Sequence, residues 1–321
     1  MRLDRRLDHQ DIMTSMFNGE PFAHTYSIVA FDDDEGTMGA AVQSNWFSVG
    51  SVVPWARSGA GVVVTQSFTD ISYGPRGLDL MESGLMSGEA LSALIAEDEH
   101  RDVRQVAMVD VRGNVAAYTG SGCIAESGHI IGPDFSVQAN MMLRPTVPEA
   151  MADAFQRAKG RLAERMLAAL QAAEGEGGDI RGRRSACLLV VRKASTGRSW
   201  EGRVTDLRVE DSSDPSADLS RLLRVHRACE RLAAGNAALV MGDLEKALKE
   251  YSAAETSYPE NEELSFWAAV SLANHGWIDA SLERFALTFE RNERWRVFAS
   301  RLYDKDHIAV GDEDLMRILS A

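Results

Sequence analysis

The chain has 321 residues, of which 45% are hydrophobic and 26% charged, so it can form one large or two ordinary globular domains. Its formal net charge of −14, with no Lys- or Arg-rich block, argues against a nucleic-acid partner. Three widely separated cysteines suggest neither a disulfide framework nor a zinc cluster and fit a reducing compartment. No stretch resembles a signal peptide or a membrane span, so we expect a cytoplasmic protein without a membrane partner.

Residues 1–24 are polar, show no sustained period and are interpreted as an N-terminal extension. Two apolar runs follow and flank an acidic connector, Asp32–Thr37, which predicts a β-hairpin headed by Thr25. A hydroxyl becomes a good nucleophile when a base takes its proton, and a free α-amino group on the same residue can be that base. Thr25 is therefore a candidate nucleophile if it becomes a chain terminus, either by cleavage of the bond after His24 or because the start site is misassigned; otherwise it is an ordinary β-branched strand residue.

After the hairpin, the hydrophobic pattern predicts a strand, two helices, two pairs of strands, a long helical region and a further strand. Their ranges, in chain order, are 61–66, 78–95, 103–120, 129–143, 148–174 and 186–191. Ser87 is the predicted N-cap of the second helix. Because hairpins are frequent and strand–helix alternation is rare, we predict an α+β domain over residues 25–210, with two antiparallel sheets face to face and helices on both outer faces.

Five sequence blocks resemble, in this order, one protein family. They are TYSIVAFD, SVGSVVPWARSGAGVVVTQ, YGPRGLDL, GHIIGPDFSVQANMM and GGDIRGRRSACLLVVR. The family is domain of unknown function 1028 (DUF1028), which is placed among the N-terminal-nucleophile (Ntn) hydrolase-like proteins, and the resemblance covers roughly residues 25–225. It implies a four-layer αββα sandwich and amide-bond hydrolysis by an N-terminal residue. Typical members have Met directly before this Thr, whereas here 24 residues precede it.

Four residues are candidates to assist Thr25. Ser27 is two positions along the strand and should project to the same face as a hydrogen-bonding hydroxyl. The Ntn resemblance implies that the end of the second strand faces the nucleophile, which suggests Ser44 as a substrate contact and Asn45 as a group that orients the amine; the alternative is a simple turn signal. Arg57 is a candidate to stabilise the nucleophile or bind a substrate carboxylate, or is a surface arginine.

Further predicted substrate-binding residues carry amide or charged side chains. Gln66 closes the strongest strand, and Gln138 and Asn140 share one face of another, where amides can act as oxyanion donors or substrate anchors, or make structural hydrogen bonds. Asp179 and Arg183 lie in a glycine-rich loop, where they either line the mouth of a site or tie the loop together by an ion pair.

Two other chemistries are weighed from single residues. Cys123 and His129 permit a Cys–His hydrolase, but nothing in their context lowers the thiol pKa, and a buried, inert cysteine is the alternative. No His, Asp or Glu cluster has metal-ligand spacing, so we expect neither a metal nor another cofactor.

The C-terminal third shows an internal period of 34 residues. The matched pairs are Leu232 and Phe266, Gly242 and Gly276, Ala247 and Ser281, Leu248 and Leu282, and Tyr251 and Phe285. This segment resembles two tetratricopeptide repeats with a partial third helix near residues 295–303. We therefore predict a turn-rich linker at 211–223 and an all-α domain at 224–321, which either binds a partner protein or supports a homo-oligomer.

The sequence leaves two functional hypotheses. In the first, the chain is an Ntn-type amidohydrolase that cleaves a small amide or peptide-like substrate with Thr25. In the second, it is a catalytically silent scaffold that binds partner proteins through its helical repeats. An N-terminus at Thr25 in the mature chain favours the first hypothesis, and an uncut leader favours the second.

Overall fold

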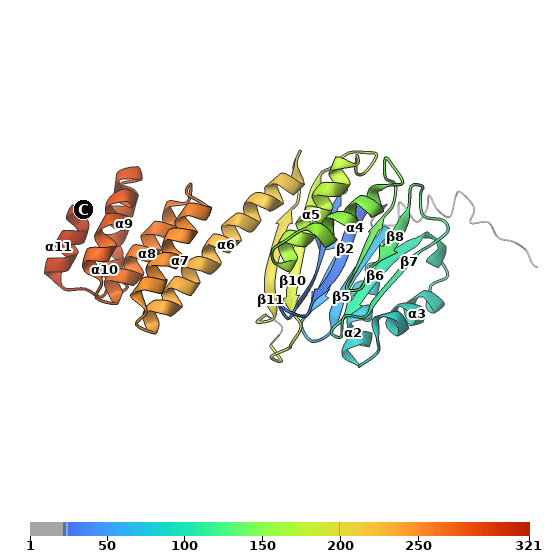
Figure 1. Cartoon of the computed structure of the whole chain (residues 1–321), viewed down its shortest axis with the longest axis horizontal. Coiled ribbons are helices and arrows are strands. Elements are labelled where there is room, and N and C mark those ends of the chain that lie inside the picture. Colours follow the sequence, from blue (N-terminus) through green and yellow to red (C-terminus); the bar gives the residue numbers. More distant parts are fainter. Residues whose placement is uncertain (1–21, 24, 199) are drawn as a thin grey trace, which may run out of the picture. The chain divides into compact units, whose positions relative to one another are not determined.

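The structure is a computed structural model that describes residues 22–23, 25–198 and 200–321 (Figure 1). The chain divides into two compact units, Met1–Ser220 and Arg221–Ala321. The described strands all lie in the first unit, while the second is helical. The predicted mixture of α and β structure is therefore confirmed. Among the described residues, no helix is both long and apolar enough to cross a membrane.

Two antiparallel sheets form the centre of the first unit. The five-stranded sheet has the order β1-β5-β6-β7, with β4 also paired to β5. Its strands are β1 (Phe22–Ala23), β4 (Pro54–Arg57), β5 (Gly61–Phe68), β6 (Arg104–Asp110) and β7 (Val115–Thr119). The six-stranded sheet has the order β11-β10-β3-β2-β9-β8. Its strands are β2 (Thr25–Asp32), β3 (Thr37–Ser44), β8 (Gly128–Ile131), β9 (Phe135–Ala139), β10 (Ser185–Arg192) and β11 (Arg203–Val209).

The hairpin at the head of the domain is confirmed. β2 pairs with β3 in a register that places Thr25 opposite Ser44, and the turn closes with a hydrogen bond from Gly36 N to Asp33 O of 3.1 Å. Gly36 has φ +62°, a conformation that side chains other than glycine adopt only at a cost. β2 is flanked by β3 and β9, so Thr25 begins an interior strand of the six-stranded sheet.

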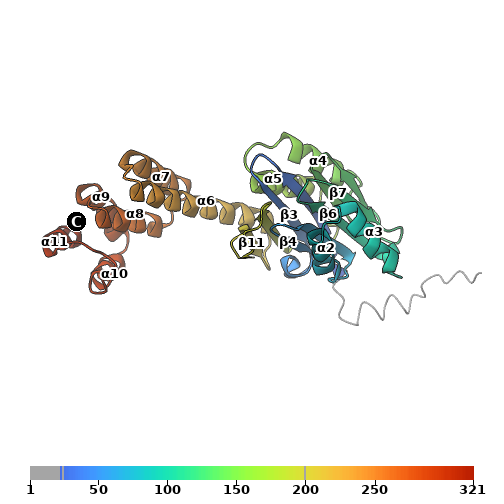
Figure 2. The same cartoon turned by 90° about the horizontal axis from the view of Figure 1, so that it is seen from below.

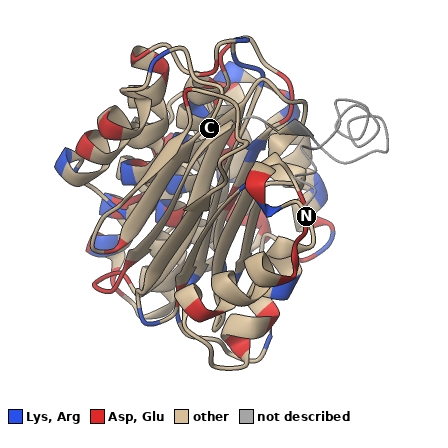
Figure 3. Cartoon of the chain, turned by 90° about the vertical axis from the view of Figure 1, so that its right-hand side faces the viewer, with Lys and Arg blue, Asp and Glu red and all other residues tan. Residues whose placement is uncertain are grey.

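An apolar core lies between the sheets, and helices cover their outer faces. Side chains of β2, β3 and β10, including Val29, Val42 and Leu189, pack there with Val62 and Val109 of the facing sheet. The helices α2 (Tyr73–Glu82) and α3 (Ser87–Glu97) cover the five-stranded sheet, and α4 (Val147–Arg157) and α5 (Leu162–Gly175) cover the other (Figures 1 and 2). Charged residues lie mostly on helices and loops, as expected when both faces of a strand are buried (Figure 3).

Three local expectations need correction. The strands β1 and β11 were not predicted, because each is recognised by its pairing with β5 or β10 rather than by its own pattern. The N-cap of α3 is Met86, one residue before Ser87, and its N–H donates to Glu89. The predicted linker 211–223 instead contains the start of α6 (Pro215–Val240), because Asp214 accepts hydrogen bonds at the helix start and proline fits the first turn.

The second unit repeats its helical turns every 34 residues. Gly242 and Gly276 have φ +76° and +81° and donate equivalent hydrogen bonds, to Leu239 O at 2.9 Å and Ala273 O at 3.0 Å. The other residues paired by the sequence period are buried in the helices or pack against the core. Besides the C-terminal part of α6, the helices are α7 (Leu244–Ser257), α8 (Glu262–Asn274), α9 (Ile278–Arg291), α10 (Arg294–Tyr303) and α11 (Asp312–Ser320).

The hairpin turn yields a stability prediction. An added Cβ at Gly36 meets nothing within 4 Å, so Gly36→Ala changes only the backbone energy at a positive φ. We expect it to lower the free energy of unfolding by about 1 kcal/mol. Gly175→Ala, at the end of α5 and equally open, is the matched control without a positive φ and should be neutral or stabilising. Denaturant unfolding of both variants measures the difference, and equal effects would contradict it.

Candidate functional site

Thr25 lies where the chain passes from one sheet to the other. Ala23, two residues earlier, is in β1 of the five-stranded sheet, while Thr25 begins β2 of the six-stranded sheet. The Thr25 side chain is fully buried, and its Oγ1 donates to Ala23 O at 2.8 Å. Because the chain continues before Thr25, its nitrogen is an amide here and not a free amine. The hydroxyl is thus held by the preceding segment, at one end of the space between the sheets.

Next to Thr25, a cluster of fully buried amides and hydroxyls joins the two sheets. We call it the inter-sheet polar network; its members are Ser27, Gln66, Gln105, Gln138 and Asn140. Ser27 Oγ donates to Gln66 Oε1 at 2.6 Å and accepts from Gln138 Nε2 at 2.7 Å. Gln66 Nε2 donates to Gln105 Oε1 at 2.7 Å, and the same oxygen accepts from Asn140 Nδ2 at 2.7 Å.

The network also holds the backbone of Thr25. The Thr25 carbonyl accepts from Gln66 Nε2 at 3.2 Å and from Asn140 N at 3.1 Å. The structure therefore brings together four residues that the sequence suggested separately: Thr25, Ser27, Gln66 and Asn140, with Gln138 beside Ser27. Since the network consists of neutral side chains that hydrogen-bond to one another, these polar groups are buried between the sheets without burying a charge.

The network extends through Gln105 toward a half-buried histidine. Gln105 Nε2 donates to Thr119 Oγ1 at 2.9 Å, and Thr119 Oγ1 lies 2.8 Å from His129 Nδ1. Since the Thr119 oxygen already accepts a hydrogen bond, its proton is available to a neutral Nδ1, and burial lowers the pKa of His129. His129 lines a cavity of about 170 Å³, and the same cavity is lined by Glu126 and Glu149.

Gln105 and Thr119 were missed by the sequence analysis. The signal was present, because Gln105 occupies an inward position in the alternating strand RQVAMVD, where the other inward residues, Ala107 and Val109, are apolar. A glutamine at such a position needs buried partners. Those partners come from other strands, so their identity could not be read locally.

Ser44 and Asn45 lie at the end of β3, where the side-chain hydrogen bonds seen among the described residues go to partners other than the Thr25 side chain. Ser44 is buried, and its Oγ accepts from Trp46 N at 2.9 Å. The Asn45 amide donates to Arg181 O at 3.1 Å and so points to the loop before β10. Asn45 is thus placed to hold that loop and not to orient the Thr25 nitrogen.

Asp179 and Arg183 do not form the ion pair considered from the sequence. Buried Asp179 binds Arg181 through Nη2 at 2.7 Å, whereas Arg183 binds Glu174 at 3.0 Å and Asp214 at 3.3 Å. The pairing differs because Asp179 caps its own turn, accepting also from Arg181 N at 2.9 Å.

Arg183 reaches the neighbour of Thr25 indirectly. Glu174, its partner, accepts a hydrogen bond of 2.6 Å from the Tyr26 hydroxyl. Burial and, second, the charge of Glu174 raise the pKa of Tyr26 well above its usual range, so the phenol remains a donor. Gln43 Nε2 donates to the same hydroxyl at 2.5 Å.

Arg57 lies away from this group. It closes β4 opposite Gly61, and Gln66 is five residues farther along β5, about 17 Å at roughly 3.4 Å per residue. Its guanidinium pairs with Asp79 at 2.8 Å and Glu82 at 2.6 Å on α2. Arg57 is therefore placed as the surface arginine that the sequence analysis gave as the alternative.

The described residues contain no activated thiol or metal cluster of the kinds considered. Burial raises the pKa of the Cys123 thiol, which donates to Arg104 O at 3.4 Å, while His129 is bonded to Thr119. A raised pKa disfavours the thiolate, so the geometry gives no support to a Cys–His pair. No group of three or more His, Cys, Asp or Glu side chains in the described part of the chain is arranged to hold a metal.

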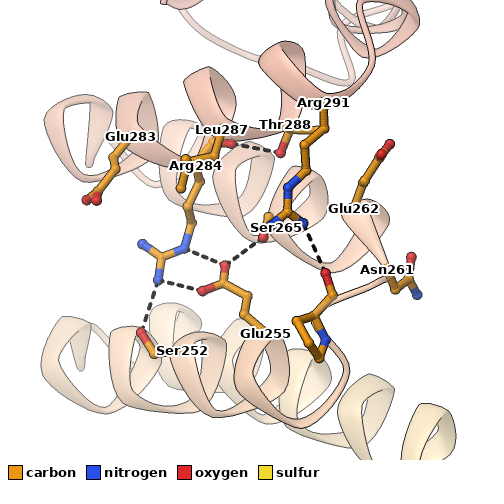
Figure 4. Close-up of a pocket in the computed structure, with 11 residues that line it drawn as sticks. Ser252, Glu255, Asn261, Glu262, Ser265, Glu283, Arg284, Leu287, Thr288 and Arg291 are labelled. Atoms are coloured by element: carbon orange, nitrogen blue, oxygen red, sulfur yellow. Dashed lines mark hydrogen bonds and ion pairs between the residues drawn. The ribbon is translucent and has the colours of Figure 1, made fainter.

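A second candidate site is a groove of about 270 Å³ in the helical unit (Figure 4). Residues of α7 and α9 line it together with the start of α8, and an ion pair of 2.9 Å joins Arg284 Nε to Glu255 across it. Arg291 Nη1 donates to Pro259 O at 3.0 Å. Because its lining contains the carboxylates of Glu255, Glu262 and Glu283 beside these two arginines, the groove offers polar contacts but no excess of positive charge.

The inter-sheet polar network yields a comparison of two buried glutamines. Gln66→Leu leaves Ser27, Gln105 and the Thr25 carbonyl with fewer partners, and we expect it to cost about 3 kcal/mol of unfolding free energy. Gln43→Leu is the control, because among the described residues the Gln43 side chain makes one hydrogen bond and its buried Oε1 has no partner. It should cost at least about 1 kcal/mol less. Chemical unfolding of both variants checks this order, and a reversed order would refute it.

Comparisons with known proteins agree with this fold. The family model described as "Family of unknown function (DUF1028)" matches residues 25–219. No curated protein matches the chain. The crystal structure of protein SPO2555 from Silicibacter pomeroyi, titled as DUF1028, is 29% identical; the match covers 63% of this chain and 88% of that one, with a TM-score of 0.56. Since the family model spans more than half of the chain and begins at Thr25, the chain belongs to the DUF1028 family.

Proposed function

We propose that this chain is an amide-bond hydrolase of the Ntn type, in which Thr25 becomes the nucleophile after cleavage between residues 24 and 25. The observation that carries the proposal is the position of Thr25: the family match starts there, at the head of an interior strand beside buried hydrogen-bonding groups. We further propose that the two sheets and their covering helices are the αββα sandwich of Ntn hydrolases.

In the proposed reaction, the free α-amine of Thr25 takes the proton of Oγ1, and the oxygen attacks the carbonyl carbon of a substrate amide. The C–N bond then breaks, the leaving amine receives that proton, and an ester to Thr25 remains. Water attacks the ester with the same amine as base, releasing a carboxylic acid and restoring the hydroxyl. No oxidant or cofactor is needed for this balance.

The inter-sheet polar network has a positioning role in this proposal. Gln66 and Asn140 hold the Thr25 carbonyl, and Ser27 is fixed between Gln66 and Gln138. Precise placement of a nucleophile lowers the entropy cost of the attack. Arg57, Asn45 and Arg183 have no direct part in it, because their side chains are engaged elsewhere.

The second candidate function, partner binding by the helical unit, rests on the groove between α7 and α9. We propose that the 34-residue recurrence of turns and core positions makes this unit tetratricopeptide-like. If the first unit has no catalytic activity and the helical unit binds a partner, residues 1–24 should remain attached to the chain. Cytoplasmic location and homo-oligomerisation remain predictions.

Processing is the direct test of the nucleophile. The purified chain should yield a product that begins at Thr25, seen by intact mass and N-terminal sequencing. Thr25→Ala should abolish this cleavage, while Thr25→Ser, which keeps a hydroxyl, should retain it. A full-length mass that persists on long incubation, in wild type as in Thr25→Ala, would refute self-cleavage and favour the binding function.

The same mechanism predicts a pH dependence for the processed chain. The α-amine must be unprotonated to act as base, and its ordinary pKa is about 7.7 to 8.0. The value of kcat/KM on an amide substrate should therefore rise with pH through about 7 to 8 and then level off. A rate that falls over this interval would contradict the amine as base.

A further inference from the structure

The residues just before Thr25 occupy a defined place in the five-stranded sheet. Phe22 and Ala23 form β1, which pairs antiparallel with the end of β5, Phe22 opposite Phe68 and Ala23 opposite Ser67. We call Ser67–Phe68 the leader-binding edge and residues 1–24 the leader. An extended segment that adds to a sheet edge is a common mode of peptide recognition, in which main-chain hydrogen bonds provide affinity.

The leader-binding edge accepts a small side chain. Ala23 is fully buried and belongs to the core cluster between the sheets, together with Val64 and Val42. A closed apolar environment of this kind tolerates added volume poorly, because a larger side chain must displace packed neighbours. The packing around Ala23 therefore admits only a small side chain two positions before Thr25.

Ser67 shows that this edge is built with a local energetic cost. Its φ is +73°, unusual for a serine, and its Oγ is buried without a hydrogen bond to any described residue, although it lies near the Cys123 thiol. Such strain and unsatisfied polarity concentrate at binding and catalytic sites. The bond from Thr25 Oγ1 to Ala23 O connects this strained edge to the hydroxyl of the proposed nucleophile, because Ala23 is the residue that pairs with Ser67.

We infer that the leader-binding edge is the acyl-side subsite of the enzyme: it binds an extended peptide antiparallel to Ser67–Phe68, with a small residue second from the bond to be cleaved. This inference rests on the proposed function and names its substrate class, a peptide with alanine or a similarly small residue at that position. Phe22 and Ala23 occupy the subsite first, and their departure makes the edge available to a peptide in trans.

The test uses full-length chains carrying Thr25→Ala, so that binding is measured without turnover. The probe is a fluorescein-labelled peptide with the sequence of residues 19–24, GEPFAH. A tethered leader has an effective concentration on the order of millimolar, so it excludes the probe. Adding Ala23→Leu should displace the leader and increase probe affinity at least tenfold by fluorescence polarisation. Ala23→Gly, which keeps the side chain small, is the matched control and should leave the probe excluded.

Changes in the probe test the mode of binding on the same Ala23→Leu chain. Leucine in place of the probe's alanine should weaken binding at least tenfold. In an antiparallel pair only alternate residues direct their N–H to the neighbour. N-methylation should therefore weaken binding strongly at one of the phenylalanine and alanine nitrogens and little at the other. Should the leucine chain fail to fold by circular dichroism, Ala23→Val takes its place.

The inference is overturned if the probe binds all chains alike or none of the folded ones, or if the leucine probe binds as well as the alanine probe. These outcomes are separable from failure of the proposed function. Probe binding with no processing or hydrolysis by the wild-type chain would leave a peptide site without Ntn activity. Hydrolysis of other amides without probe binding would leave the activity and remove this subsite.

Discussion

The structure of the first unit depends on satisfying polar groups that are buried between two apolar sheets. Side-chain amides from β5, β6 and β9 and the hydroxyl of Ser27 bond to one another across this space. Each would be costly if left unpaired, so the partners must adopt one mutual arrangement. That arrangement also fixes the Thr25 carbonyl, which makes the position of the candidate nucleophile a consequence of core packing.

The same end of the sandwich contains the features that depart from good packing. Ser67 has a left-handed backbone and a buried hydroxyl that has no hydrogen-bond partner in the described part of the chain, although it lies near the Cys123 thiol, and Thr25 Oγ1 is bonded to the segment that precedes it. A satisfied network beside a strained edge is the combination expected when a site is held rigid for a ligand that is not part of the domain itself. The two-residue strand Phe22–Ala23, which is adjacent and extended, fits the place of such a ligand.

Local sequence signals predicted local structure well. The β2–β3 hairpin was predicted because its strands, acidic turn and Gly36 are contiguous, and the repeat in the second unit because Gly242 and Gly276 recur at a fixed distance. Pairings between distant segments were not accessible: β1 is recognised only by its contact with β5, more than forty residues later. The start of α6 was readable in principle, since aspartate followed by proline is a helix-start signal, but the acidic composition suggested a linker.

The candidate site residues show the same difference between local signals and long-range pairing. Ser27, Gln66, Gln138 and Asn140 were suggested by strand position, and strand pairing then determined that they meet. Arg57 and Asn45 failed to join them because a side chain at the end of a strand takes the partner that its neighbouring loop or helix offers.

The contacts of Tyr26 connect the loop before β10 to the candidate nucleophile, Thr25. Tyr26 follows Thr25 directly, and its hydroxyl is held by Glu174, which also binds Arg183. Arg183 in turn binds Asp214 and the Ser213 carbonyl at the start of α6. Since successive strand residues face opposite sides of a sheet, Tyr26 is held from the helix side while Thr25 is held from the inter-sheet side. The backbone at the head of β2 is therefore restrained on both faces, which is the condition a strand terminus must meet to hold a nucleophile in one orientation.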